Sequence, residues 1–130
     1  MFGGLNAAAS GLAADQVWMR LVGTNLANAN DATMAGARPY RALEPVMQAS
    51  FGQSGLANGV AVTRVVASAA PPGMVYAPGV RGANAQGYVA GSNVNLSVQM
   101  VDLLAAGRAY QANAAAFQAA KAEDQAAVQI

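Results

Sequence analysis

Histidine and cysteine are both absent from the 130 residues of the chain. Their absence excludes disulfides, thiolate nucleophiles, imidazole acid–base catalysis and zinc sites of the usual kind. Charge is scarce as well, because only 10% of the residues are charged, against roughly 25% in ordinary soluble domains. Apolar residues reach 55%, so we expect other molecules to cover much of the surface.

The few charged side chains are too dispersed for nucleic-acid binding or catalysis. The seven basic residues are spread along the chain and the net charge is +1, which leaves no basic cluster that could follow a phosphate backbone. Only Glu123 and Asp124 adjoin among the acids, and neighbours on a helix point about 100° apart. The single lysine, Lys121, has no serine at Ser-x-x-Lys spacing. We therefore expect neither enzyme activity nor a nucleic-acid partner.

The glycines do not form a phosphate-binding loop. They match neither the Gly-x-Gly-x-x-Gly pattern nor the Walker pattern, and the stretch GVRGANAQG predicts turns instead. We expect no cofactor, no metal and no small-molecule substrate.

Membrane insertion is not expected either. The first fourteen residues are uncharged, but no Lys or Arg precedes them, so they indicate a helix of the protein rather than a signal peptide. No window offers about twenty apolar residues free of Gly, Pro and charge. Amphipathic helices lying on a membrane surface are an alternative, although few Lys or Arg flank the apolar faces.

A seven-residue repeat of large apolar residues marks the N-terminal part of the chain. The positions three residues after each member of this repeat are occupied by Ala8, Asp15, Val22 and Ala29. Asp15 is the one polar residue among them. Such a repeat predicts a helix with a coiled-coil seam. The stretch NLANAN should end this helix, because asparagine tolerates left-handed backbone and bonds nearby carbonyls. The repeat consists of Leu5, Leu12, Met19 and Leu26, and the terminating asparagines are Asn25, Asn28 and Asn30.

A second seam occupies the C-terminal part. Its seven-residue repeat predicts another long helix, capped by Asn93 or Asn95. Arg108 is expected to be either solvated or paired with a carboxylate or carbonyl of a partner subunit. The repeat consists of Leu96, Leu103, Tyr110 and Phe117, with Met100, Gly107 and Ala114 at the complementary positions.

The middle of the chain loses the helical period and gains Gly, Pro and β-branched residues. Residues 59–68 and 73–78 read as strands, and residues 32–38 as a flexible connection. The predicted fold is mainly α with a small β insertion. Residues 1–31 and 93–130 form the paired helices of one coiled-coil core domain, and residues 32–92 form a β-rich insertion.

We expect the notable side chains of this fold to make packing and interface contacts and to take no part in catalysis. Trp18 lies beside a seam residue and is expected to pack in the core or at an interface. The faces outside the seams are rich in alanine, which allows close helix packing with several neighbours. The predicted helix-packing and interface residues are Leu5, Leu12, Met19, Val22, Leu26, Asn25, Asn28, Leu96, Met100, Leu103, Arg108, Tyr110, Asn113 and Phe117.

Two long motifs resemble a known family. AASGLAADQVWMRLVGTNLANAN (8–30) is similar to the N-terminal signature of bacterial flagellar axial proteins, which build the rod and hook. SNVNLSVQMVDLLAAGRAYQANAAAFQAAKA (92–122) resembles their C-terminal segment. PYRA (39–42) and PPGMVYAPG (71–79) are most similar to a proximal-rod subunit. Val98 and Gln99 depart from the pattern, because the family commonly has two acids there.

The resemblance implies a structural subunit of the basal-body rod in the periplasmic space. It implies homo- and hetero-oligomeric contacts with other flagellar rod proteins, with membrane-ring and export-gate components as further partners. It also implies export through the flagellar type III apparatus without a cleaved signal peptide, and terminal helices that surround the export channel. Another axial subunit of the rod remains the alternative.

Overall fold

The computed structural model describes residues 3–32 and 37–129. Two helices bracket two short antiparallel sheets, so the predicted fold class is confirmed. Most of the expected connection at 32–38 lies outside the described residues. In chain order the elements are α1 (Gly3–Ala27), β1 (Leu43–Phe51), β2 (Ala57–Ala67), β3 (Gly73–Tyr76), β4 (Tyr88–Gly91) and α2 (Leu96–Val128).

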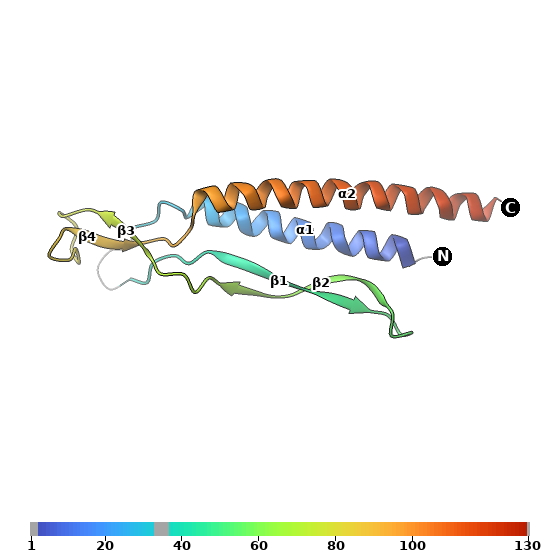
Figure 1. Cartoon of the computed structure of the whole chain (residues 1–130), viewed down its shortest axis with the longest axis horizontal. Coiled ribbons are helices and arrows are strands. Elements are labelled where there is room, and N and C mark those ends of the chain that lie inside the picture. Colours follow the sequence, from blue (N-terminus) through green and yellow to red (C-terminus); the bar gives the residue numbers. More distant parts are fainter. Residues whose placement is uncertain (1–2, 33–36, 130) are drawn as a thin grey trace.

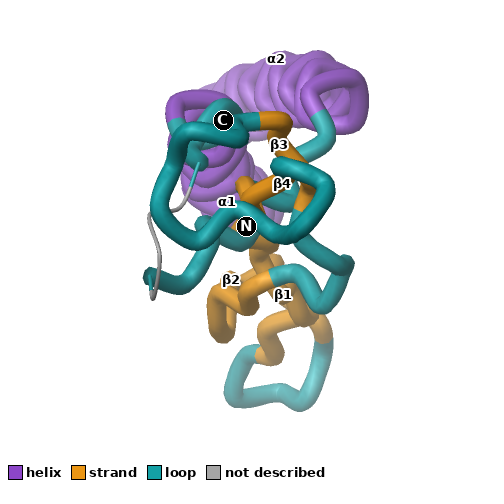
Figure 2. The backbone as a smooth tube through the Cα atoms, turned by 90° about the vertical axis from the view of Figure 1, so that its left-hand side faces the viewer, coloured by secondary structure: helices purple, strands orange, loops and turns teal. Residues whose placement is uncertain are grey.

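The molecule is elongated, and its layers run parallel to the helices. The helices α1 and α2 lie antiparallel, with both chain ends at the same end of the molecule (Figure 1). The β1–β2 hairpin lies along α1 on the side away from α2, so α1 is the middle layer (Figures 1 and 2). The β3–β4 sheet projects beyond the start of α2 (Figure 1). Within the described residues, neither helix has the length and apolar character needed to cross a bilayer.

Local signals explain where the helices end. The helix α1 stops inside NLANAN, as predicted, but no described asparagine there has left-handed backbone. The Asn28 Nδ2 instead donates to the Thr24 carbonyl at 2.8 Å. The helix α2 begins after Asn95, whose side chain accepts from the Val98 backbone N–H at 3.1 Å, so Asn95 is the N-cap.

The β1–β2 hairpin contains one of the predicted strands and a partner that the sequence did not reveal. Residues 59–68 were expected as a strand and correspond to β2. Its partner β1 contains Pro45, which lacks an N–H and usually argues against a strand. Pro45 is tolerated opposite Val65 because β1 has only one neighbouring strand, and the ladder is irregular between Val46 and Met47.

The β3–β4 sheet lies at the end of the molecule opposite the two chain ends (Figure 1). The predicted strand at 73–78 is β3, and it pairs with β4, which was not foreseen. The rings of Tyr76 and Tyr88 meet edge to face, with centroids 5.3 Å apart. Ala32 forms a bridge with Gly91, so the chain leaving α1 also contacts this sheet.

The interior between the helices is made of small and polar residues. Val22 is 2% exposed, whereas the four large residues of the N-terminal seam are only half-buried. The helices approach closely at Gly11, where a Cβ atom would lie 2.6 Å from Asn113 Nδ2. The buried residues along this contact and its flanks are Ala8, Gly11, Ala14, Asp15, Val22, Asn25, Gln99 and Ala106.

The expected pairing of two apolar seams is therefore wrong on the α2 side. Leu96 is 45% exposed, Met100 60% and Leu103 41%, whereas Gln99 and Ala106 face the interior. The physical reason lies in α1, which buries Asp15 and Asn25. These polar groups need hydrogen-bonding partners, because a leucine opposite them would leave them unsatisfied. Tyr110 and Phe117 remain half-buried.

The close approach at Gly11 leads to a first prediction. Alanine should stabilise an exposed helical glycine by up to about 1 kcal/mol, yet Gly11→Ala should lower the unfolding free energy. Its Cβ would displace Asn113 and break a hydrogen bond from Asn113 to Asp15, and bonds to charged groups contribute about 1.5–3 kcal/mol. Gly23→Ala is the matched control on the same helix, since its Cβ meets no described atom within 4 Å. Thermal unfolding followed by circular dichroism would measure both, and equal melting temperatures would refute the packing argument.

Candidate assembly interface

Asn25 joins three elements of the fold. Its Nδ2 donates to the Leu43 carbonyl at 2.9 Å and to Gln99 Oε1 at 2.8 Å. Its Oδ1 accepts from the Leu43 backbone N–H at 2.8 Å and from the Tyr40 hydroxyl at 2.9 Å. The residue is 1% exposed, and both donors and both acceptor positions of its amide are used. Asn25 therefore holds the start of β1 against both helices.

The hydroxyl of Tyr40 should make the stability of these Asn25 contacts depend on pH in the alkaline range. Burial raises the pKa of the Tyr40 phenol above its usual value of 10.0, so the folded state favours the protonated hydroxyl that donates to Asn25. This contribution should be fully present below pH 10 and lost as the pH rises through the folded pKa. Urea unfolding of wild type and Tyr40→Phe at increasing pH would measure it. The stability difference between the two proteins should shrink above pH 10, and a constant difference would contradict this role.

Asn93 makes a second joint at the start of α2. Its Oδ1 accepts from the Ala42 backbone N–H at 2.7 Å, and its Nδ2 donates to the Ala70 carbonyl at 2.9 Å. These bonds tie the chain entering β1 and the chain leaving β2 to the same asparagine. The Asn93 side-chain amide supplies hydrogen-bond partners for backbone groups of these irregular segments, which have no strand or helix to pair them.

Two further polar contacts fasten the long elements. The Ser10 hydroxyl of α1 accepts from the Val60 backbone N–H of β2 at 3.0 Å. Asn113 Nδ2 of α2 donates to Asp15 Oδ2 of α1 at 2.7 Å, which is a charge-assisted bond. We call the set Ser10, Asp15, Asn25, Asn93, Gln99 and Asn113 the polar framework. It fixes the hairpin and the two helices to one another, and it leaves the large apolar side chains in the first half of α2 exposed.

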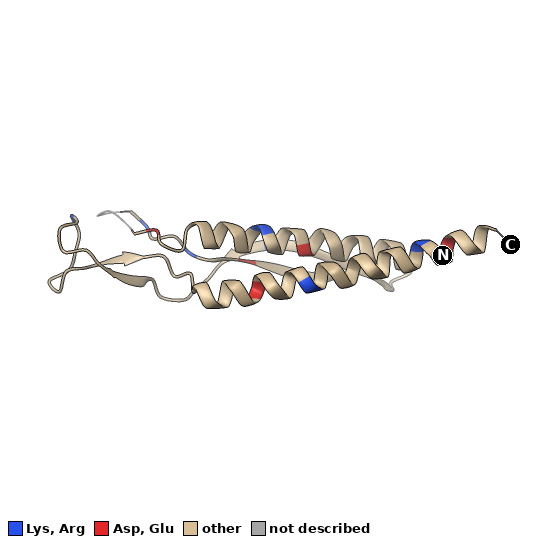
Figure 3. Ribbon diagram, turned by 90° about the horizontal axis from the view of Figure 1, so that it is seen from above, with Lys and Arg blue, Asp and Glu red and all other residues tan. Residues whose placement is uncertain are grey.

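These free side chains form an apolar strip on the first half of α2. Their exposure is unusual because large apolar side chains normally lie in the core, and a contiguous exposed group marks a binding surface. The helices carry few charges that could interrupt such a surface (Figure 3). The strip consists of Leu96, Val98, Met100, Val101, Leu103 and Leu104.

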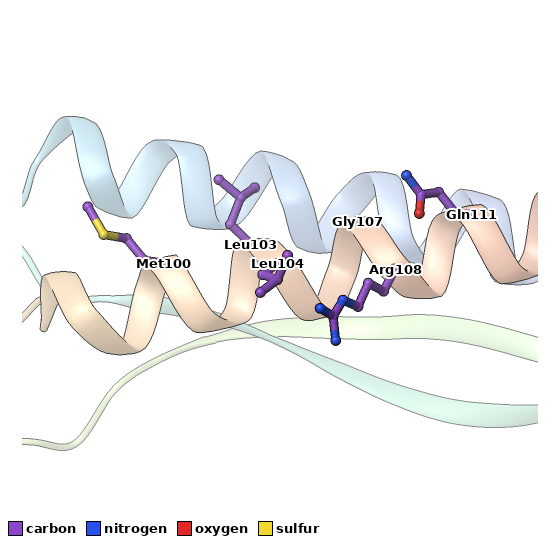
Figure 4. Close-up of a pocket in the computed structure, with 6 residues that line it drawn as sticks. All are labelled: Met100, Leu103, Leu104, Gly107, Arg108 and Gln111. Carbon is purple, nitrogen blue, oxygen red and sulfur yellow. The ribbon is translucent and has the colours of Figure 1, made fainter.

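A groove of about 490 Å³ opens along one side of the apolar strip. Six α2 residues line it (Figure 4): Met100, Leu103, Leu104, Gly107, Arg108 and Gln111. Arg108 is exposed and makes no hydrogen bond or ion pair with the described part of the chain. A groove with apolar walls and one unpaired guanidinium is suited to a protein segment that carries an acid.

The structure divides the predicted interface residues into three groups. Asn25, Asn113 and Val22 pack within the chain, and Leu5, Leu12, Met19, Leu26, Asn28, Tyr110 and Phe117 are half-buried. Leu96, Met100, Leu103 and Arg108 face outward. A role of any of these residues in contacts between subunits stays a prediction. Sequence reasoning missed Gln99 and Tyr40 as partners of Asn25, and the only available signal was a polar residue interrupting an apolar helix.

The motifs of the chain have counterparts in known proteins. Residues 85–130 match the family described as flagellar basal body rod FlgEFG protein C-terminal. The flagellar basal-body rod protein FlgC of Salmonella typhimurium is 41% identical, over 82% of this chain and 79% of the relative. The FlgC protein of Bacillus subtilis is 34% identical, over 92% of this chain and 91% of the relative. The chain therefore belongs to the FlgC family of flagellar basal-body rod proteins, and it is a structural protein of the flagellar rod.

Proposed function

We propose that this chain builds the proximal part of the rod by packing the apolar strip of α2 against neighbouring subunits. The observation that carries the proposal is the exposure of this strip on a helix whose inner face is already satisfied by the polar framework. Contacts between non-identical patches of neighbouring subunits extend into an open helical array. The chain acts as a building block and carries no catalytic residue.

The polar framework suits such a building block to the transmission of torque. Buried hydrogen-bond networks that are fully satisfied fix one arrangement of the elements that they join. Asn25 and Asn93 fasten the β1–β2 hairpin to the helices at one end of the hairpin, and Ser10 fastens it near the other end. A subunit whose hairpin is fastened to its helices at both ends deforms little when force is applied to it. Stiff subunits in turn make a stiff rod.

The remaining parts of the proposal are supported by the resemblance to flagellar axial proteins. The paired helices surround the export channel, and the chain reaches the periplasmic rod through the flagellar type III apparatus without a cleaved signal peptide. Its neighbours are copies of itself, other rod proteins, and components of the membrane ring and export gate. A different position along the rod is the alternative.

Deletion of the gene in its own host tests this function. Loss of swimming, with basal bodies that lack a rod, is the expected result, and the wild-type gene should restore both. An epitope inserted in the exposed β1–β2 turn should label the proximal rod in purified basal bodies. Complete rods in the deletion strain would refute the proposal, and label at the distal rod would favour the alternative. Flotation of the purified chain with lipid vesicles would instead indicate membrane-surface binding.

A further inference from the structure

A second groove, of opposite charge, lies over α1 and is lined by residues of α1, β1 and α2. Its volume is about 320 Å³, and its lining residues are Trp18, Glu44, Pro45, Met47 and Asp102. Glu44 and Asp102 are acids, and no Lys or Arg lines this acidic groove. The Arg108 groove has the complementary composition, with one guanidinium and no acid among its lining residues.

The two grooves open on different sides of α2. Asp102 lines the acidic groove, whereas Gly107 and Leu104 line the Arg108 groove. At 3.6 residues per turn, Gly107 points about 140° away from Asp102 around the helix, and Leu104 about 200° away. One molecule can therefore contact a neighbour through each groove at the same time.

The acidic groove has the chemistry of a guanidinium receptor. Two carboxylates can accept the paired N–H groups of an arginine, and an indole attracts a cation placed over its face. Trp18 supplies the indole, and Pro45 and Met47 supply apolar walls for the methylene stem of the arginine. The side chain that enters this groove should be an arginine flanked by apolar residues, and Arg108 with Leu104 fits that description.

We propose that Arg108 of one copy binds between Glu44 and Asp102 of a second copy, against Trp18. The proposal rests on the proposed function and names one contact of the assembly. It explains both why Arg108 has no partner within the described part of its own chain and why two acids lie beside a partly exposed tryptophan. The contact joins different patches of the two copies, so it can be repeated from copy to copy.

The contact also sets an axial step between copies. Arg108 lies six residues after Asp102 on α2, which is about 9 Å along the helix axis at 1.5 Å per residue. Copies whose α2 helices lie parallel, and which contact through these two positions, are displaced relative to one another along the helix axis. Repetition of a displaced contact gives a helical path and not a flat closed ring.

Cysteine cross-linking in assembled rods tests the contact, because the natural chain has no cysteine to interfere. Cells should express two variants together, Arg108→Cys and Glu44→Cys. Purified basal bodies treated with a short bismaleimide should yield a thioether-linked dimer containing one chain of each variant, because the ion-paired side chains hold the two Cα atoms farther apart than the about 7 Å that a disulfide can span. Rods that contain only one variant are the control and should yield no dimer. Absence of the mixed dimer from rods that contain both variants would overturn the inference and leave the proposed function intact. A cross-link to a different rod protein would also overturn it.

Charge reversal provides an independent test. Arg108→Glu and Glu44→Arg should each lower the yield of complete rods at least about tenfold, because each substitution places like charges in contact. Arg108→Ala should lower the yield less. The double variant should recover part of the yield, because it restores one ion pair with its ends exchanged while Asp102 remains beside the new carboxylate. Failure of the double variant, when circular dichroism shows that both single variants fold, would overturn the inference. If the wild-type chain is absent from basal bodies, the proposed function itself fails.

Discussion

Leu103→Asp should abolish swimming while leaving the fold of the subunit intact. Leu103 is 41% exposed and lies outside the polar framework, so an aspartate there costs the isolated chain little. In the assembled rod the same position is expected to be buried against a neighbour. An unpaired carboxylate buried in such an interface costs several kcal/mol, which is enough to prevent assembly. Cells carrying the variant should form no swimming halo in soft agar, and their basal bodies should lack complete rods.

A second substitution and a fold measurement separate assembly from stability. Gln53→Asp places the same charge in the exposed β1–β2 turn and should leave swimming unchanged. Circular dichroism of purified Leu103→Asp should match wild type, whereas Leu12→Asp should lose helicity because Leu12 is half-buried. Motile Leu103→Asp cells with intact rods would show that the apolar strip is not an interface.

The sequence was sufficient for the fold class but not for the rotation of α2. The seven-residue repeat located both helices, because a repeat of apolar residues is a property of one segment. Which face of α2 meets α1 depends instead on the partner helix. Asp15 looked like an interruption of the first seam, yet it is buried and bonded to Asn113. An outward apolar face in a chain that assembles cannot be distinguished by pattern from a face that packs inside the subunit.

The middle of the chain was predictable where β-branched residues gather. The strand β2 is rich in valine and was located, whereas β1 contains Pro45 and was not. Of the two four-residue strands, β3 was located and β4 was not. The acidic groove was not predictable at all, because its residues come from α1, β1 and α2 and adjoin only after folding. Of the groove residues, only Trp18 was singled out from the sequence, as an aromatic residue that packs either in the core or at an interface.

Asn25→Leu should be the most damaging change to the fold. The substitution keeps the side chain's size but leaves the Leu43 N–H, the Leu43 carbonyl, the Tyr40 hydroxyl and Gln99 Oε1 without their partner. Each buried polar group left unsatisfied costs about 1–3 kcal/mol, and water can replace part of the loss at the half-buried Tyr40 and Leu43. We expect a total loss of about 3–6 kcal/mol, a large share of the about 5–15 kcal/mol that stabilises a typical domain. Urea unfolding of the purified chain would measure this loss, and swimming should be lost in cells.

Asn25→Asp distinguishes the hydrogen-bond pattern from the packing. Aspartate has nearly the same shape, so Oδ1 can still accept from Leu43 and Tyr40, but the second oxygen faces the Leu43 carbonyl and Gln99 Oε1 where an NH₂ group stood. Repulsion between these oxygens should raise the pKa of the new carboxyl, so the folded state holds its proton more tightly than the unfolded state. The variant should therefore gain stability relative to wild type as the pH falls through that raised pKa. Asn28→Asp is the control, because the Asn28 amide makes one local bond to Thr24 and the change should cost less than about 1 kcal/mol. If Asn25→Asp followed the pH profile of Asn28→Asp, the four hydrogen bonds of Asn25 would not hold the start of β1 to the helices.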